Sequence, residues 1–259
     1  MKNDKGIKIL IIISVSVLVF TVGIIGFVGL ELIYQKEPIE SEVNSVISQT
    51  VSDITVSASE NKDTEYSNLL LVNGKNPLPE DYDYEQNLIV IDPKYLNGYN
   101  NKINKDIAPY LFSMIEAAWK DGVELFIRSP YRTYNDQKIL FENQVAKYTL
   151  QGYDHETAEA KASTVVARPA TSEHHTGLAV DFNAAEDYFG TTESYKWLTE
   201  NAEEYGFILR YKAEKEHITG VIDEPWHWRY VGKEHAKKIN ELNMCLEEYV
   251  EYLGTTTGS

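Results

Sequence analysis

Two short segments of the chain carry side chains whose types and spacing could perform metal chemistry. The first, SEHHTGLAVD, places the imidazole of His174 seven residues before the carboxylate of Asp181. The second, EPWHWR, adds Glu224 and His227. Two histidines and one carboxylate from separate elements are a typical catalytic zinc set, in which a fourth position is left for water. His174, Asp181 and His227 are therefore candidate zinc ligands.

The first segment also predicts which way the Asp181 side chain faces on its strand. A strand over residues 177–183 begins at a glycine, which allows a tight bend after the histidines. Side chains alternate along a strand, so Leu178, Val180 and Phe182 face one way and Asp181 faces the other. A lone buried carboxylate is costly, so Asp181 needs either a charged partner or a metal.

The second segment places a further carboxylate close to the candidate metal. Glu224 lies three residues before His227, and in a regular strand the two would face opposite sides. Pro225 cannot donate to a strand ladder, and a bulge there would bring both side chains to one pocket. A carboxylate near a metal-activated water, but not bound to the metal, is the general base that hydrolysis requires. The zincin pattern H-E-x-x-H is absent.

Each of these residues also has a purely structural explanation. A single histidine is more often structural than a ligand, and Asp181 alone could be an ion-pair partner. The tryptophans on either side of His227 fit core positions as well. The case for a metal therefore depends on the whole set. We assign structural roles to His155, His217 and His235.

The elements that must position these residues are predicted from hydrophobic spacing. We expect helices over residues 107–121, 134–150, 154–163, 195–205 and 239–253. Short strands are expected over residues 125–129, 177–183, 207–211 and 226–231. Thr133 with Asp136 resembles a capping box, and Asp154 is a candidate cap. Irregular alternation of helices with short strands predicts an α+β fold, in which helices flank a small, mostly antiparallel central sheet.

The start of the chain predicts a membrane anchor. No charged residue occurs from Ile9 to Leu30, a run of 22 residues, which is enough for a helix to cross about 30 Å of hydrocarbon. Lys2, Lys5 and Lys8 precede the run, so the positive-inside rule places the N-terminus in the cytoplasm. A cleaved signal peptide is the alternative, but its apolar region is shorter and ends at a small-residue site. Both interpretations place the rest of the chain outside the cytoplasmic membrane.

Composition divides the chain into four parts and excludes some partners. Residues 1–30 are the tip and anchor, 31–67 a polar extracytoplasmic stalk, 68–254 one domain and 255–259 a tail. The net charge is -16, and the first 30 residues carry +2, so the remainder carries -18. Such an acidic body is a poor nucleic-acid binder. The single cysteine, Cys245, excludes a disulfide framework and is expected in the core on a helix.

The two motifs together resemble a known family. The pattern S-x-H-x-x-G-x-A-x-D followed by E-P-W-H is similar to VanY-type D-alanyl-D-alanine carboxypeptidases. These belong to a group of zinc metallopeptidases with lysostaphin-like, D-Ala-D-Ala and hedgehog-type domains. The segment SPYRT is similar to the family's S-G-Y-R-S, with Pro130 in place of glycine. The likeness covers about residues 68–253.

The resemblance implies a role for each matching residue. These roles are zinc ligands for His174, Asp181 and His227, catalytic base for Glu224, oxyanion or carboxylate binding for Arg132, and substrate contacts for Ser172 and Gln137. His175, beside His174, is an alternative ligand. Pro130 restricts φ and removes a donor just before Arg132, which leaves the placement of Arg132 open.

The resemblance also implies an activity. It indicates a hydrolase that removes the terminal D-Ala from peptidoglycan pentapeptide stems outside the cell membrane. That reaction would remove the target of glycopeptide antibiotics such as vancomycin. The same fold can act as an L,D-carboxypeptidase or a peptidoglycan endopeptidase. A non-catalytic wall-binding module is a third alternative, but it would be expected to have lost Glu224 or a ligand.

Overall fold

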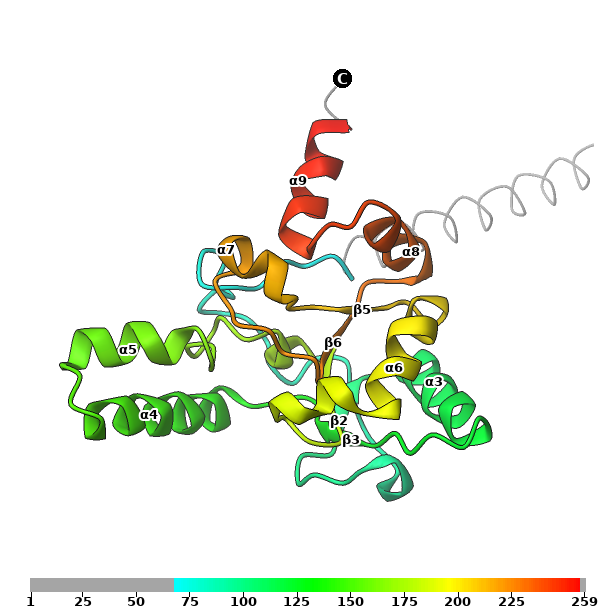
Figure 1. The fold of residues 1–259 in the computed structure, drawn as a ribbon, viewed down its shortest axis with the longest axis horizontal. Helices are drawn as coiled ribbons and strands as arrows, with labels where there is room; N and C mark the ends of the chain where they lie inside the picture. Colours follow the sequence, from blue (N-terminus) through cyan, green and yellow to red (C-terminus); the bar gives the residue numbers. More distant parts are fainter. Residues whose placement is uncertain (1–67, 257–259) are drawn as a thin grey trace, which may run out of the picture. The chain divides into compact units, whose positions relative to one another are not determined.

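The structure, a computed structural model, describes residues 68–256, which Figure 1 draws as a coloured ribbon. These residues belong to the second of two compact units, Lys62–Ser259. The predicted anchor and stalk, residues 1–67, lie outside the described residues, as does the end of the tail at 257–259. Within the described part of the chain, no helix is both long enough and apolar enough to cross a bilayer.

Four short strands form the central sheet. In spatial order they are β3 (Ile127–Ser129), β4 (Ala179–Phe182), β6 (His227–Tyr230) and β5 (Phe207–Leu209), and each neighbouring pair is antiparallel. All residues of the two inner strands, β4 and β6, are buried. The predicted α+β fold with a small antiparallel sheet is confirmed.

The main core joins the sheet to helices α3 (Ala108–Lys120) and α6 (Glu193–Asn201), which lie side by side in Figure 1. Both helices and the inner strands contribute to one apolar cluster, which includes Leu111, Met114, Ile115, Val180, Phe182, Trp197, Leu198, Trp228 and Tyr230. Leu178, Val180 and Phe182 pack in this cluster, while the equally buried Ala179, on the same face as Asp181, does not. The predicted alternation along β4 is therefore confirmed.

A second apolar cluster holds the end of the domain. Helices α8 (Lys233–Glu241) and α9 (Leu246–Thr256) pack with β5 through Ile208, Val231, Ala236, Ile239, Leu246 and Tyr249. The single helix predicted over residues 239–253 was therefore wrong. Asn243 adopts a left-handed conformation (φ 48°) between the two helices, and asparagine tolerates that conformation better than most residues. Cys245 is buried next to this break, directly before α9.

Helices α4 (Tyr134–Leu150) and α5 (His155–Ser163) form a hairpin that extends away from the sheet in Figure 1. A small cluster of Phe141, Val145, Ala158 and Ala162 joins the two helices. The predicted capping box is present, because Thr133 accepts from the Asp136 backbone while Asp136 accepts from the Thr133 backbone. Asp154 caps α5, also as predicted. The first turn of α4 thereby fixes the chain just after Arg132.

Short elements complete the fold. A separate antiparallel pair, β1 (Leu88–Val90) with β2 (Lys102–Asn104), was not predicted, since three-residue strands carry too little periodicity. The predicted helix over 195–205 is α6 followed by the 3-10 helix η4, and it ends at Gly206. The remaining helices are α7 (Glu216–Thr219), η1 (Pro93–Tyr95), η2 (Glu173–Thr176), η3 (Asp187–Thr191), η4 (Ala202–Tyr205) and η5 (Ala213–Lys215). Of these, η2 carries His174.

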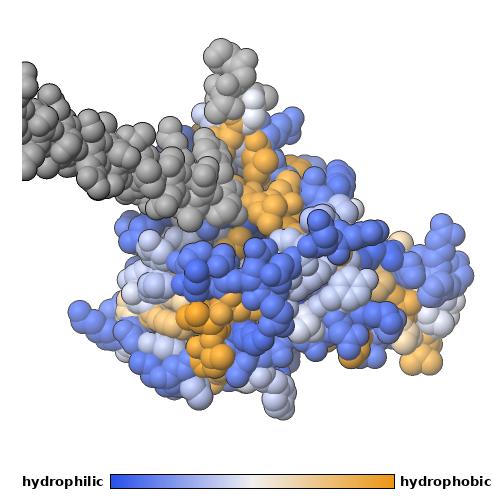
Figure 2. Space-filling model, turned by 180° about the vertical axis from the view of Figure 1, so that it is seen from behind, coloured by the Kyte–Doolittle hydropathy of each residue, from blue (hydrophilic) through white to orange (hydrophobic). Residues whose placement is uncertain are grey.

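The face that Figure 2 shows, from the side opposite to Figure 1, is mostly hydrophilic, and smaller apolar patches interrupt it. A charged, mostly polar surface favours solubility and says little about the reaction. The chemistry must therefore be sought among the buried polar residues.

Candidate active site

Three of the predicted residues meet at the centre of the sheet. Asp181 on β4 is paired directly with His227 on β6 in the antiparallel register, and His174 comes from η2 just before β4. One ligand atom from each lies within 4.8 Å of the others, and all three side chains are buried. The sequence prediction that these residues form one group is confirmed.

Hydrogen bonds fix the tautomer of His174. Its Nδ1 lies 2.8 Å from the carbonyl oxygen of Pro130. A carbonyl can only accept, so Nδ1 carries the hydrogen and Nε2 presents its lone pair. That Nε2 lies 3.3 Å from Asp181 Oδ1, and His227 Nδ1 lies 3.1 Å from the same oxygen. Two imidazole nitrogens and one carboxylate oxygen therefore converge.

The donor set fits a zinc ion. Asp181 Oδ1 is buried and has no hydrogen-bond partner, although an unpaired buried acceptor is costly. Burial raises the pKa of Asp181, but the neighbouring His174 and Arg132 outweigh burial and hold that pKa well below its usual range. Burial and the charge of Arg132 lower the pKa of His174 to about 4. An ionised carboxylate and a neutral imidazole are ligand forms that zinc binds, which Asp181 and His174 provide. At His227 burial lowers the pKa, but Asp181 and Glu173 outweigh burial and raise it to about 9, so this ring must release a proton when zinc binds.

Arg132 lies against these ligands. Its Nη2 donates to Asp181 Oδ2 at 2.6 Å and lies 3.0 Å from His174 Nε2. The guanidinium also donates to Ser129 Oγ at 2.8 Å and to Gln137 Oε1 at 3.0 Å. With Pro130 two positions before it, Arg132 reaches the ligand group, and the Pro130 carbonyl is the acceptor for His174.

The two predicted substrate contacts differ in their surroundings. Gln137 is fully buried, and besides accepting from Arg132 it donates through Nε2 to the Ala167 carbonyl at 2.7 Å. The amide oxygen of Gln137 thus holds Arg132, and its amide nitrogen holds Gln137 itself against the backbone. Ser172 lies directly before η2 and is 3% exposed, next to the segment that carries His174. Contact of either residue with substrate stays a prediction.

His175 is oriented away from the ligand group. Its Nδ1 lies 2.9 Å from the Arg132 carbonyl, and its Nε2 accepts from the Ala170 backbone at 3.3 Å. Its ring also packs against Tyr84 and Tyr134. Both ring nitrogens are therefore engaged with backbone groups. His175 supports the loop around Arg132 and does not join the three ligands.

Glu224 reaches the ligand group from a turn. The His227 amide donates to the Glu224 carbonyl at 3.0 Å, so residues 224–227 form a β-turn with Pro225 in its second position. The bulge predicted at Pro225 is thus a turn, and β6 begins only at His227. Glu224 Oε2 lies 3.6 Å from His227 Nδ1, and Glu224 is 8% exposed. Burial raises the pKa of Glu224 to about 7.

A buried ion cluster lies on the other side of His227, and its four members were not predicted. Glu173 Oε1 accepts from Arg210 Nε and Arg229 Nη1, both at 2.8 Å. Arg210 also donates to both oxygens of Glu247, at 2.8 and 2.7 Å. Burial raises the pKa of Glu173, but Arg210 and Arg229 hold it well below its usual range. The sequence signal was an arginine inside each of two predicted strands, 207–211 and 226–231.

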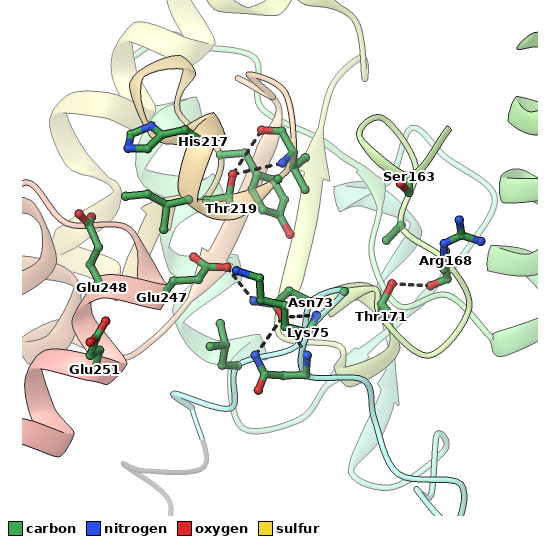
Figure 3. A pocket seen from close by; sticks show the side chains of 18 residues that line it. Asn73, Lys75, Ser163, Arg168, Thr171, His217, Thr219, Glu247, Glu248 and Glu251 are labelled. Atoms are coloured by element: carbon green, nitrogen blue, oxygen red, sulfur yellow. Dashed lines mark hydrogen bonds between the residues drawn. The ribbon is translucent and has the colours of Figure 1, made fainter. Parts of the chain in front are cut away.

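A cleft opens beside the ligand group, and Figure 3 shows its lining. It has a volume of about 740 Å³, and Tyr211 and Ala167 are among the residues that line it. The Tyr211 ring lies 4.9 Å from the His227 ring, and the Ala167 carbonyl holds Gln137. Acidic residues of α9 line one side of the cleft, opposite Arg168 and Thr171 (Figure 3). The cleft therefore lies near the ligand group, although none of the three ligands, Glu224 or Arg132 lines it.

Comparison with known proteins agrees with this geometry. The family model described as VanY, D-alanyl-D-alanine carboxypeptidase, matches residues 100–233. A D-alanyl-D-alanine carboxypeptidase of Enterococcus faecalis (strain ATCC 700802 / V583) is 45% identical over 193 residues, which cover 74% of this chain and 69% of the relative. The matched residues include every predicted ligand together with Glu224 and Arg132.

Two solved structures are similar in both sequence and fold. A variant of the vancomycin resistance D,D-pentapeptidase VanY, in complex with Zn(II), is 45% identical with a TM-score of 0.59, covering 71% of this chain and 98% of that one. The LdcB LD-carboxypeptidase is 40% identical with a TM-score of 0.61, covering 70% of this chain and 84% of that one. The similar structures thus include carboxypeptidases of two stereochemical classes.

Proposed function

Because the chain belongs to the VanY family of D-alanyl-D-alanine carboxypeptidases, we propose that it is a zinc-dependent D,D-carboxypeptidase that removes the terminal D-Ala from peptidoglycan pentapeptide stems. One observation carries the proposal. Three buried ligands converge at the centre of the sheet, and a fourth residue, the carboxylate Glu224, lies 3.6 Å from His227 without being one of them. That is the arrangement hydrolysis at a catalytic zinc requires.

The chain's own residues divide the reaction between them. When bound, zinc supplies a Lewis acid that polarises the scissile carbonyl and lowers the pKa of water. Glu224 takes the proton of the attacking water and returns it to the amine of the leaving D-Ala. Burial places the pKa of Glu224 at about 7, in the range where a carboxylate can both accept and return a proton near neutral pH.

Arg132 supplies the positive charge that faces the substrate. His174 Nε2 has a single lone pair, so Arg132 and zinc cannot both use it. When zinc is bound, the guanidinium keeps Ser129, Gln137 and Asp181 as acceptors and has the second Nη2 hydrogen available for an oxyanion or a terminal carboxylate. Its fixed, planar donors suit either group.

The cleft beside the site accommodates the peptide that precedes the scissile bond. It begins at Tyr211, next to His227, and continues for about 740 Å³ between α9 and the loop that carries Arg168. A carboxypeptidase must hold the chain upstream of the bond it cuts, while only one residue lies downstream. A cleft of this volume is larger than one amino acid requires.

An L,D-carboxypeptidase is the second candidate. The similarity to LdcB, at 40% identity, is the observation that favours it. The two activities differ in the peptide consumed, since a D,D-enzyme shortens the pentapeptide and an L,D-enzyme shortens the tetrapeptide. An endopeptidase would cut cross-linked peptides. A non-catalytic wall-binding module would not need Glu224, Arg132 and all three ligands together.

Mass spectrometry of products tests the proposal directly. The full chain is incubated with a synthetic pentapeptide ending in D-Ala-D-Ala and, separately, with the matching tetrapeptide. We expect the pentapeptide to lose one alanine, the tetrapeptide to stay intact, and a zinc chelator to stop the reaction. Loss of alanine from the tetrapeptide alone would favour the L,D-activity instead. No release from either peptide by the zinc-loaded protein would refute the proposed function.

We also propose that residues 1–30 anchor the chain in the bacterial cell membrane, with residues 31–67 as a stalk and the domain outside. The uncharged run and the preceding lysines support this location. In that place the enzyme meets wall precursors and would contribute to glycopeptide resistance. Protease added to intact spheroplasts should digest the domain. Protection of the domain until the membrane is lysed would contradict the proposed orientation.

A further inference from the structure

Two buried polar atoms behind the metal ligands lack a hydrogen-bond partner. They are Oε2 of Glu173 and Nε2 of His227. The two atoms lie 3.5 Å from each other, and the side chains are 0% and 5% exposed. That separation is slightly longer than a good N–H to oxygen hydrogen bond. Because an unpaired buried donor or acceptor is costly, a small rotation that joins the two atoms satisfies both.

The opposite edge of the same ring faces the reaction. Nδ1 of His227 lies 3.1 Å from Asp181 Oδ1 and 3.6 Å from Glu224 Oε2. A neutral imidazole has one N–H group and one lone pair. A group that accepts a hydrogen bond from Nε2 therefore keeps the hydrogen on Nε2. The lone pair is then on Nδ1, where it can bind a metal.

We propose that Glu173 is the positioning residue for His227. Its carboxylate accepts the Nε2 hydrogen and thereby fixes both the tautomer and the rotation of the ring, so that Nδ1 is presented to zinc. This role rests on the proposed function and adds to it a residue that does not touch substrate or metal. Carboxylates that accept from a metal-bound histidine also raise its basicity as a ligand.

The surroundings of Glu173 suit this role. Its Oε1 accepts from Arg210 Nε and Arg229 Nη1, each at 2.8 Å. Those two bonds fix the carboxylate plane and leave only Oε2 for His227. Arg229 is itself held by the carbonyls of Asn68 and Leu70, both at 2.9 Å. The carboxylate is therefore anchored to three separate segments of the chain before it meets the histidine.

Charge within the cluster is balanced. Glu173 and Glu247 contribute two negative charges, and Arg210 and Arg229 contribute two positive charges. Glu247 lies beyond Arg210, which it binds through both of its oxygens, and no contact joins it to His227 among the described residues. Glu247 thus shares the cluster's structural role without the proposed positioning role. It is the matched control for Glu173.

The two histidine ligands are oriented by different groups. His174 donates its Nδ1 hydrogen to the Pro130 carbonyl at 2.8 Å, which leaves Nε2 for the metal. His227 uses the reverse arrangement, with a carboxylate behind Nε2 and Nδ1 in front. The proposal therefore predicts opposite ligating nitrogens for the two histidines.

Zinc affinity of the full chain tests the proposal. Glu173→Gln replaces the carboxylate with a neutral amide that cannot hold the Nε2 hydrogen as strongly. We expect the zinc dissociation constant, measured by competition with a chelator, to rise about 10- to 100-fold. Glu247→Gln should lower resistance to denaturant but leave the zinc dissociation constant within about threefold. Equal weakening of zinc binding in both variants would reduce Glu173 to a structural member of the cluster and overturn the proposal.

A measurement on the unsubstituted chain keeps the proposal testable if Glu173→Gln does not fold. Nitrogen-15 NMR of the protein loaded with cadmium-113 identifies the metal-bound nitrogen of each histidine by scalar coupling. We expect coupling to Nδ1 of His227 and to Nε2 of His174. Coupling through Nε2 of His227 would refute the role of Glu173.

Failure of this inference can be told apart from failure of the proposed function. If the unsubstituted chain binds zinc and shortens the pentapeptide while Glu173→Gln keeps full zinc affinity, only the positioning role is wrong. If the unsubstituted chain binds zinc but releases no D-Ala, the proposed function is wrong and the zinc measurements still decide the role of Glu173.

Discussion

Two groups of buried charges lie on opposite sides of the His227 ring. On one side are Asp181 and Glu224, with Arg132 against them. On the other side Glu173 is bound by two arginines. Both groups are buried, and both contain carboxylates beside guanidinium groups. They differ in how completely the protein itself satisfies them.

In the ion cluster around Glu173, two carboxylates bind two arginines. Of these four side chains, only Glu173 has a buried polar atom without a hydrogen-bond partner, which is Oε2, facing His227. The ligand group is incomplete, because Asp181 Oδ1 has two imidazole nitrogens near it and no hydrogen-bond partner. Buried charges that find partners within the chain stabilise one conformation. Buried ligand atoms that converge without hydrogen-bond partners indicate instead a bound ion or a reacting group. The predictions below test this difference.

The largest effect is expected on the incomplete side. His174→Ala removes one of three zinc ligands, so zinc should be lost and D-Ala release should fall to the level of the blank. Elemental analysis of the purified variant measures the zinc content. His155→Ala, at an exposed position on α5, is the control and should keep both zinc and activity. Full zinc occupancy in His174→Ala would exclude it as a ligand.

Glu224→Gln should separate chemistry from metal binding. The amide cannot take a proton from water, so turnover should fall about 100- to 1000-fold, the usual scale for one such group. Zinc should stay stoichiometric, because Glu224 is not one of the three ligands. Kinetics on the pentapeptide and elemental analysis of the same sample measure the two quantities. Turnover near that of the unsubstituted chain would rule out Glu224 as the base.

Arg210→Met should act on stability. The change leaves Glu173 and Glu247 buried with fewer partners, which commonly costs about 3–5 kcal/mol in the free energy of unfolding. Denaturant titration of the variant measures that loss. At saturating zinc, D-Ala release by the folded fraction should fall much less than in Glu224→Gln. A free energy of unfolding within about 1 kcal/mol of the unsubstituted chain would mean that the cluster is not needed for stability.

The smallest effect is expected for an ion pair in water. Glu142→Gln breaks the contact between Lys138 and Glu142 on α4, where both side chains are more than half exposed. Water screens both charges, so such pairs contribute little. The variant should match the unsubstituted chain in denaturant titration and in D-Ala release. A loss of unfolding free energy as large as that of Arg210→Met would mean that an exposed ion pair matters as much as the buried cluster.

Much of the fold could be predicted because the evidence for it is local. The capping box at Thr133, the cap at Asp154 and the apolar face of α3 each depend on residues within a few positions. The predictions failed at two places where the local pattern of residues was misleading or too short. The last helix is broken at Asn243, whose left-handed conformation overrides an apolar pattern that continues on both sides. The β1–β2 pair is too short to leave a periodic signal.

The site shows the same division. His174, Asp181, His227 and Glu224 lie in two motifs, and alternation along one strand already indicated that Asp181 faces away from the apolar cluster. The turn at Pro225 was predicted as a bulge, although the consequence for Glu224 was correct. Gln137 holds Arg132 in the structure, a role that was not predicted, and its contact with substrate stays a prediction. A local pattern can identify which residues are chemically suited to a site, but not which neighbouring groups they bind in the folded protein.

The sequence by itself determined the ligand types, the carboxylate that could serve as base, the α+β class and the charge of the body. Only the tertiary structure decided that Asp181 lies opposite His227, that Arg132 reaches Asp181 and His174, and that Glu173 lies behind the His227 ring. Arg210 and Arg229 follow Glu173 by 37 and 56 residues. No local pattern encodes such a distance, because the contact exists only when β5 and β6 pack beside η2 and exclude the water that would otherwise solvate the three charges.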